Sequence, residues 1–464
     1  MSAYLLGNRI LILGFVGVLG IAAVGAQGYA PGGAPGIDPD GSRVGPDPIG
    51  GSGAPSMARK SSGELDTSFA GDGTTWSYLP GGGGPAVDPQ DLAEAVAVDA
   101  GGGIIVAAHG AIHAFAIVRY TADGTLDTTF GSNGLATPFA GMGGQARAMA
   151  IQPDGRIVVG GFAAGSFALA RLMADGSLDA SFGSGGQVLS DISPGASELA
   201  HGMALQADGR IVLAGQADGG SGVVVTLARY NTDGSLDATF GAGGLVFSGF
   251  PGGANAVAVQ PDGRIVVAGF SFLVTRFNAD GTLDTGFGSG GQVAVPFGDT
   301  GWESEAFAIL VQPDGGVVVA GGTYGSQYEF AVARLGPAGS LDRGFGHDGM
   351  VTTDFYGGRD SARALVLQPD GRLVAAGFGR ASNQSDINNS HFALARYESN
   401  GALDRSFGKS GRATGAIDNP VFNDFARALA AQPDGRLVAA GNIHIVCEVA
   451  GCDFSGYALA RFLP

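Results

Sequence analysis

A short hairpin motif recurs seven times in this chain and limits its fold more than any other feature. Its clearest copy runs from Val259 to Gly269, where Pro261, Asp262 and Gly263 form a turn between two apolar strands. Proline presets φ to about −65° at the second position of such a turn, and glycine accepts the positive φ that a tight turn needs. The turns of the other copies are centred on Gly102, Gly155, Gly209, Gly315, Gly371 and Gly435.

Each repeat unit is predicted to contain four short antiparallel strands, which is the content of one β-propeller blade. In the second unit these strands lie near residues 146–152, 156–161, 167–172 and 187–189. The strand runs are apolar on both faces, as expected for a blade packed between two neighbours. The sequence therefore predicts an all-β fold, a seven-bladed β-propeller of four-stranded antiparallel blades.

The two ends of the repeat region indicate how the ring closes. The region opens at Gly63 with the end of a unit and stops at Pro464 directly after a third strand. A spare strand within 74–79 can therefore complete the last blade, and this pairing removes two exposed sheet edges. A linear solenoid is the rival fold, but its two ends would need distinct polar caps.

Upstream of the repeats, the chain carries the features of an exported protein. Residues 1–26 have the layout of a secretory signal peptide, with Arg9, an apolar run over 10–24 and small residues at 24–26. The apolar run is shorter than the roughly 20 residues that span a bilayer, which favours cleavage over a membrane anchor. Residues 27–61 are rich in Gly, Pro, Ala and Ser and predict a flexible linker, and residues 62–464 are the predicted propeller domain. We expect a secreted or periplasmic monomer.

The net charge and the cysteine content limit the partners and the metal sites that can be expected. A formal net charge of −17 argues against nucleic acid or an anionic membrane surface as a partner. Cys447 and Cys452 are expected to form one local disulfide; a metal site is the alternative, but only His444 lies near them. Segments 231–237 and 278–284 faintly resemble calcium loops, although ordinary Asp-Gly turns explain them better. No cofactor and no metal site is predicted.

The repeat motifs together resemble a known family. The sequences Gln-Pro-Asp-Gly-Arg, Ala-Leu-Ala-Arg-Tyr and Leu-Asp-x-x-Phe-Gly are similar to those of the delta-sixty-repeat family of bacterial β-propellers. The resemblance extends from Ser62 to the end of the chain, and it implies a propeller without an assigned activity. Two turns depart from the motif, because residues 99–103 read Asp-Ala-Gly-Gly-Gly and Ala207 replaces the proline of the third unit. These departures affect the rigidity of the turns and leave the predicted fold unchanged.

Every unit also repeats two charged residues and a phenylalanine. The arginines close the third strands and are Arg119, Arg171, Arg229, Arg276, Arg334, Arg396 and Arg461. The aspartates belong to the Leu-Asp-x-x-Phe segments and are Asp66, Asp127, Asp179, Asp237, Asp284, Asp342 and Asp404. A lone buried charge is very unfavourable, so the equal numbers favour an Arg–Asp pair inside each blade over a ring of ligand-binding arginines. The phenylalanines are expected to wedge between blades and are Phe69, Phe130, Phe182, Phe240, Phe287, Phe345 and Phe407.

One position varies among the units although the residues around it stay small or apolar. It lies five residues before each turn-opening residue and is occupied by Glu94, Arg147, His201, Asn255, Phe307, Arg363 and Arg427. Because this position begins the innermost strand, the seven side chains should ring one mouth of the central channel. The variable loops between second and third strands open on the same face and are longest at 379–391 and 442–456. Trp302 and Tyr324 are further candidates, for stacking on a sugar. The alternative is that the ring positions are merely solvated strand starts.

These features predict a non-catalytic exported protein that binds a protein or a carbohydrate with its variable face. The arginines of the ring favour an anionic or polar ligand such as a carboxylate or an acidic sugar. A second hypothesis is an extracellular hydrolase or lyase at the channel mouth, where Glu94 and His201, with Glu303 and Glu305 in a nearby loop, offer acid–base groups. A third is a structural or adhesive surface protein tethered by the linker. The sequence contains no nucleophile elbow and no phosphate loop.

Overall fold

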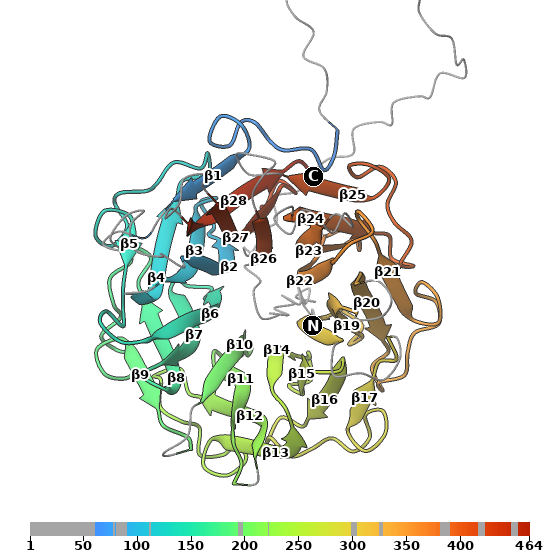
Figure 1. The fold of residues 1–464 in the computed structure, drawn as a ribbon. Helices are drawn as coiled ribbons and strands as arrows, with labels where there is room; N and C mark the ends of the chain where they lie inside the picture. Colours follow the sequence, from blue (N-terminus) through green and yellow to red (C-terminus); the bar gives the residue numbers. More distant parts are fainter. Residues whose placement is uncertain are drawn as a thin grey trace, which may run out of the picture.

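The computed structural model describes residues 61–77, 79, 91–110, 113–193, 198–220, 222–297, 304–323, 328–380, 390–415, 423–446 and 453–464. These residues form a ring of seven four-stranded antiparallel sheets around a central channel (Figure 1). The seven-bladed propeller predicted from the repeats is confirmed. No helix occurs within these ranges, and so none that is long and apolar enough to cross a membrane. The predicted signal peptide and residues 27–60 of the predicted linker lie outside them.

Each blade contains four strands in chain order from the channel outward, except that the last blade takes its outermost strand from the start of the ring. The innermost strands are β2 (Leu92–Val98), β6 (Gly144–Ile151), β10 (Leu199–Leu205), β14 (Ala254–Val259), β18 (Glu305–Val311), β22 (Ser361–Leu367) and β26 (Asn423–Ala431). The second strands are β3 (Ile104–Gly110), β7 (Ile157–Ala163), β11 (Ile211–Asp218), β15 (Ile265–Gly269), β19 (Val317–Gly322), β23 (Leu373–Arg380) and β27 (Leu437–Val446).

The outermost strand is the shortest strand in most blades. The third strands are β4 (His113–Tyr120), β8 (Ser166–Leu172), β12 (Val223–Tyr230), β16 (Leu273–Phe277), β20 (Phe330–Leu335), β24 (Ser390–Tyr397) and β28 (Asp453–Phe462). The outermost strands are β1 (Thr74–Ser77), β5 (Leu135–Ala136), β9 (Gln187–Ser190), β13 (Leu245–Pro251), β17 (Gln292–Ala294), β21 (Met350–Thr353) and β25 (Arg412–Gly415).

The ring closes as the two ends of the repeat region predicted. Strand β1 pairs antiparallel with β28, with Thr74 opposite Ala460 and Ser77 opposite Tyr457. The first and last strands of the chain therefore share one sheet, next to each other in Figure 1. The last blade has no open edge where its fourth strand would be missing.

The repeated turn has the geometry that its residues dictate. Gly263 donates its backbone N–H to the carbonyl of Gln260 at 2.9 Å and has a φ of +86°. The Asp262 carboxylate accepts the backbone N–H of Arg264 at 3.0 Å, which fixes the second half of the turn. A residue with a side chain would be strained at the φ of Gly263, so the glycine holds the hairpin register.

The apolar core lies between blades, because the strands are buried on both faces. Phe240, at the end of the third unit, is fully buried and packs against Gly281 of the next blade, where an added Cβ would lie 2.9 Å from its ring. The backbone beside this wedge is tied to the same turn, since Gly241 donates its N–H to the carbonyl of Asp280 at 2.8 Å. All seven phenylalanines of this position are fully buried. Each one therefore fills the gap to its neighbouring blade.

Each third-strand arginine pairs with the aspartate of its own blade. The Nε–Oδ2 distances in the seven pairs lie between 2.7 and 2.9 Å. Burial alone would raise the pKa of Asp179, but hydrogen bonds from Ser181 and the charge of Arg171 lower it to about 2. The Asp179 carboxylate is therefore ionised in the folded protein at neutral pH.

A second arginine reaches the same aspartate in five blades, which the sequence did not lead us to expect. This arginine comes from the hairpin turn, and its Nε lies 2.8–3.3 Å from the aspartate Oδ2. The five residues at this position are Arg156, Arg210, Arg264, Arg372 and Arg436. Gly103 and Gly316 take its place in the first and fifth blades. The scaffold aspartate is therefore doubly neutralised in most of the ring.

The third-strand arginine also bridges two blades. Arg276 donates from Nη1 to the carbonyl of Pro337 in the next blade, and its guanidinium lies 4.4 Å from the centre of the Phe287 ring. The same cation–π contact occurs at all seven positions, at 4.4–4.8 Å. One side chain thus joins its own blade, the wedge and the neighbouring turn.

The sequence overestimated one loop of the variable face. Residues 442–456 were expected to form a long loop, but β27 and β28 remain paired as far as Val446 opposite Asp453. This prediction is wrong because polar and apolar residues alternate in Asn442-Ile443-His444-Ile445, a pattern that is typical of a strand and not of a loop. The other long loop is shorter at both ends than expected, since β23 extends to Arg380 and β24 begins at Ser390.

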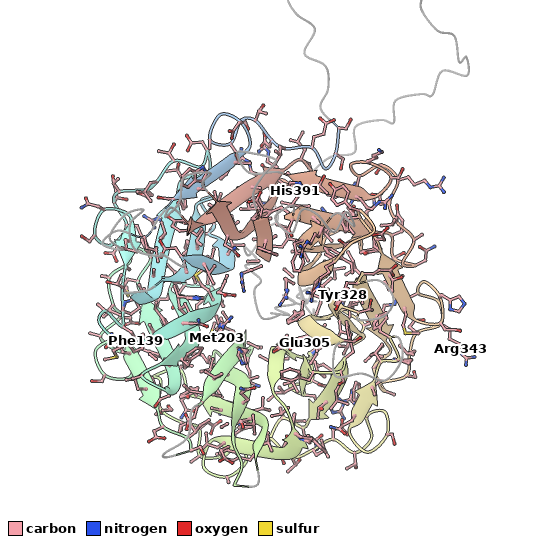
Figure 2. All side chains as sticks on the ribbon, in the orientation of Figure 1. Phe139, Met203, Glu305, Tyr328, Arg343 and His391 are labelled. Atoms are coloured by element: carbon pink, nitrogen blue, oxygen red, sulfur yellow. The ribbon has the colours of Figure 1, made fainter. Side chains whose placement is uncertain are left out.

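Replacing Arg276 with alanine should destabilise the protein by about 2–3 kcal/mol, because Asp284 would keep only Arg264 as a counter-charge and the hydrogen bond to Pro337 would be lost. Thermal unfolding followed by circular dichroism measures this change. Arg343, exposed on the outer rim (Figure 2), is the matched control, and Arg343→Ala should leave the melting temperature within about a degree. An Arg276→Ala protein that melts with the wild type would refute the buried-pair role.

Candidate functional site

The seven variable residues occupy one structural position, a β-bulge in each innermost strand. In β6, Ala146 pairs with Gly161 and Ala148 with Gly160, so Arg147 between them is the extra residue. The same register shift falls at Glu94, His201, Asn255, Phe307, Arg363 and Arg427 in the other blades. A bulge takes its extra residue out of the regular alternation and re-aims the side chain. The sequence analysis placed these residues at the strand starts and did not predict the bulge.

A small residue opposite each bulge lets the two strands approach closely. A Cβ on Gly161 would lie 2.1 Å from the Gln145 carbonyl oxygen, so only glycine fits the present backbone. In five other blades an added Cβ would lie 1.8–2.1 Å from the equivalent carbonyl oxygen. The glycines there are Gly215, Gly269, Gly321, Gly377 and Gly441. Ala108 stands in this place in the first blade. The glycine near the end of the second strand is therefore the sequence signal for the bulge.

The bulges bring all seven side chains into the wall of one cavity between the innermost strands, which is called the mouth below. The cavity has a volume of about 190 Å³ and is lined by Glu94, Arg147, His201, Asn255, Phe307, Arg363 and Arg427. This volume equals about six water molecules in the liquid, at roughly 30 Å³ each. Trp302 and Tyr324 lie outside the described residues, as do Cys447 and Cys452.

Glu94 supplies a negative charge in this wall and links two arginines from neighbouring blades. Its Oε1 accepts a hydrogen bond from Nη1 of Arg427 at 3.1 Å and from Nη1 of Arg147 at 3.2 Å. The Glu94 side chain is 8% exposed, whereas those of Arg147 and Arg427 are 26% and 30% exposed. Burial alone would raise the pKa of Glu94, but the charges of Arg427 and Arg147 lower it below its usual value. The carboxylate is therefore ionised at neutral pH.

The arginines form the positive part of the wall. Arg147 donates from Nη2 to Gln145 Oε1, and Arg427 donates from Nε to Asn442 Oδ1 at 3.1 Å. The Nε of Arg147 is buried and has no hydrogen-bond partner among the described residues. The Arg363 guanidinium stacks on the Phe307 ring, 3.5 Å from its centre. All three guanidinium groups are thus held by neighbouring side chains.

Asn255 is fixed from the neighbouring blade. Its Nδ2 donates to Glu305 Oε1 at 2.8 Å and to the carbonyl of Ala306 at 2.9 Å. The sequence placed Glu305 in a loop, but it is the first residue of β18 and lies toward the centre of the ring in Figure 2. That prediction was wrong because strand β18 starts two residues before its bulge at Phe307.

Two histidines lie next to the charged groups, and both are neutral at pH 7. Burial, followed by the repulsion of Arg147, lowers the pKa of His201 to about 4. Burial also lowers the pKa of His109 to about 4, although the charge of Glu94 acts in the opposite direction. His109 sits on β3 behind the ring and is only 5% exposed. The sequence singled out His201 but not His109, because the latter belongs to another position of the repeat.

A second cavity of about 430 Å³ lies on the opposite face, between the last and first blades. It exists beside Ala100, Gly101 and Gly102, the residues that replace the usual turn in the first unit. Two of its charged lining residues, Arg436 and Arg461, are already paired with Asp66. This cavity is a seam of the scaffold, and we do not assign it to the candidate site.

The described residues contain no group of three or more His, Cys, Asp or Glu side chains placed to hold a metal ion. In the segments that faintly resemble calcium loops, the aspartates serve their own turns. The Asp233 carboxylate accepts both the N–H and the hydroxyl of Ser235, and Asp280 does the same with Thr282.

The fold and the repeated motifs define a β-propeller repeat protein. Six segments match the sequence profile described as a β-propeller domain of unknown function (DUF5122), at residues 102–130, 152–182, 206–240, 260–287, 312–345 and 368–407. Each matched segment runs from a hairpin turn to the phenylalanine wedge. The match supports a relation to a β-propeller repeat family of unknown function. The description of this family does not contain the name delta-sixty. None of the curated proteins matches this sequence.

Several solved structures resemble the chain at low sequence identity. A protein from Lactobacillus plantarum is 16% identical, with a TM-score of 0.43 over 71% of this chain and 84% of its own. A protein of unknown function from Dyadobacter fermentans is 12% identical, with a TM-score of 0.42 over 83% and 97%. The polysaccharide lyase Uly1 is also 12% identical, with a TM-score of 0.39 over 80% and 90%. At these scores the similarities give no information about function.

The two neutral histidines predict that the folded protein becomes less stable at acidic pH. Because folding lowers the pKa of His109 and His201 from 6.5 to about 4, their stabilising effect is present above pH 6.5 and is lost as the pH falls toward 4. The double variant His109→Gln/His201→Gln should therefore lose less melting temperature between pH 7 and pH 4 than the wild type. His347, which is 95% exposed, provides the control variant His347→Gln. Parallel curves for the double variant and the wild type would contradict this role.

Proposed function

We propose that this protein is an exported, non-catalytic binding module that holds an anionic group at the mouth of its channel. The observation that supports this most is the convergence of Arg147, Arg363 and Arg427, from three blades, on one cavity. Among the described residues, Glu94 is the one carboxylate that lines this cavity. Guanidinium groups match carboxylate and phosphate oxygens in shape and charge. In a chain with a formal net charge of −17, such a local excess of positive charge attracts anions selectively to this place.

The contacts within the ring favour a binding site over solvated strand starts. Glu94 is 7% exposed, and a carboxylate is not buried at a freely solvated position. The side chains of Arg147 and Arg427 are 26% and 30% exposed, so part of each remains accessible to a ligand in the cavity.

Glu94 has a distinct part in this proposal. Its Oε1 occupies one donor of Arg147 and one of Arg427 at 3.2 and 3.1 Å, which is long for a charge-assisted bond. The carboxylate thus keeps two arginines together in the absence of ligand and competes with an incoming anion. It lowers affinity and raises the stability of the free protein.

The support for export comes from the sequence alone. Residues 1–26 combine Arg9, a 15-residue apolar run over 10–24 and a small-residue site, as secretory signals do. Mass spectrometry of the mature protein from the natural host should give an N-terminus at Gln27. Recovery of a chain that begins at Met1 would contradict cleavage.

A thermal-shift experiment tests the anion site. Sodium sulfate, acetate or glucuronate at millimolar concentration should raise the melting temperature above that in sodium chloride of equal ionic strength, because a ligand of the folded state stabilises it. The double variant Arg147→Ala/Arg363→Ala should lose this increase. Arg343→Ala, which changes an exposed arginine of the outer rim, should keep it. A double variant that responds like the wild type would exclude the mouth as the site.

Glu94→Gln gives the opposite result if the proposal is correct. Removal of the competing charge should tighten anion binding about tenfold, the equivalent of one charge-assisted contact of about 1.4 kcal/mol. The melting temperature without ligand should fall. A variant that is destabilised and binds anions no more tightly would show that Glu94 is only structural. Chemical conversion of a bound sugar acid would instead favour the hydrolase or lyase hypothesis.

A further inference from the structure

The wall of the mouth is divided into two sectors with different chemistry. Blades six, seven, one and two contribute Arg363, Arg427, Glu94 and Arg147, so every bulge residue of this sector is charged. Blades three to five contribute His201, Asn255 and Phe307. The imidazole of His201 is neutral at pH 7, so no bulge residue of this second sector carries a charge. A ligand that fills the cavity therefore meets charged bulge residues on one side and uncharged bulge residues on the other, where the Glu305 carboxylate is bound to the Asn255 amide. The second side is called the neutral sector.

The neutral sector accepts hydrogen bonds. Both N–H groups of the Asn255 amide face acceptors, one in the Glu305 carboxylate and one in the Ala306 carbonyl. Two acceptors fix the amide orientation without ambiguity, because only the NH₂ end can donate to them. The carbonyl oxygen of Asn255 remains as an acceptor, and a neutral imidazole offers one acceptor nitrogen as well. Hydroxyl groups are the donors that suit such a surface.

The volume of the mouth limits the part of a ligand that can enter it. About 190 Å³ holds one compact unit, so a larger ligand would place only one unit in the cavity. A simple anion such as acetate would satisfy the charged sector and leave the acceptors of Asn255 and His201 to water. A plain sugar would do the reverse and leave the arginines without an anion.

Resting on the proposed anion site, we infer that the mouth binds a hydroxylated carboxylate of the size of one sugar acid. Its carboxylate lies against Arg147 and Arg427, and a hydroxyl group donates to the carbonyl oxygen of Asn255. Phe307, already stacked under Arg363, gives this sector its apolar floor. Selectivity for a sugar acid over a simple carboxylate thus comes from the neutral sector.

Isothermal titration calorimetry of the full chain at pH 7 tests this inference with glucuronate, acetate, glucose and sulfate as probes. Glucuronate should bind about tenfold more tightly than acetate, the effect of about one additional hydrogen bond in the cavity. Glucose should give no measurable heat. Equal affinities for glucuronate and acetate would overturn the inference and leave the anion site standing. If none of the three anions binds, the proposed function itself fails.

The variant Asn255→Leu separates the two sectors. It removes the acceptor, so the ratio of glucuronate to acetate affinity should fall from about ten to about one. His201→Leu acts from the neighbouring blade and should reduce the same ratio, which protects the test if one variant folds poorly. Arg343→Ala should preserve the ratio. Loss of both affinities in equal proportion in the two leucine variants, at wild-type melting temperature, would overturn the division into sectors.

Discussion

The ion pair between each third-strand arginine and the aspartate of its blade is the contact on which the rest of the ring depends. The arginine makes two further contacts. Arg276 pairs with Asp284, stacks on Phe287 and donates to the backbone carbonyl of Pro337. A buried charge that loses its partner is strongly unfavourable, so the three contacts favour the same arrangement of two blades. Because the contact is repeated around a closed ring, it fixes every blade against both neighbours. The turns that accept these hydrogen bonds are therefore similar in all blades.

This scaffold leaves one position per blade free to vary. The bulge is produced by the backbone, through a glycine such as Gly161 that lets the second strand approach the first, and it does not depend on the side chain that it re-aims. Arginine, glutamate, histidine, asparagine and phenylalanine all occupy it without a change in strand register. The chemistry of the mouth is therefore separated from the stability of the blades. This separation supports the proposal that the ring composition serves a ligand.

Internal repetition explains how much could be predicted from one sequence. Seven copies act as their own alignment, so the constant Arg276 and the variable Arg147 were recognised as different kinds of residue. The neighbours of the variable residues were not recognised as such, because His109 and Glu305 occupy other positions of the repeat and Glu305 was placed in a loop. The strand ends were also misjudged around residues 442–456, where β27 and β28 stay paired and only a short alternation at residues 442–445 indicates it. Local patterns specify turns and core positions well, and strand ends poorly.

The sequence by itself determined the seven blades, the closure by the first strand and the seven positions of the ring, because these follow from local turns, strand periodicity and the count of units. Only the tertiary structure decided which ring residues meet. Arg427 and Glu94 are 333 residues apart and come together because the last blade packs against the first. The bulges, the orientation of the Asn255 amide and the neutral state of His201 likewise depend on neighbouring blades, since hydrogen-bond partners and burial come from the packing and not from the local chain.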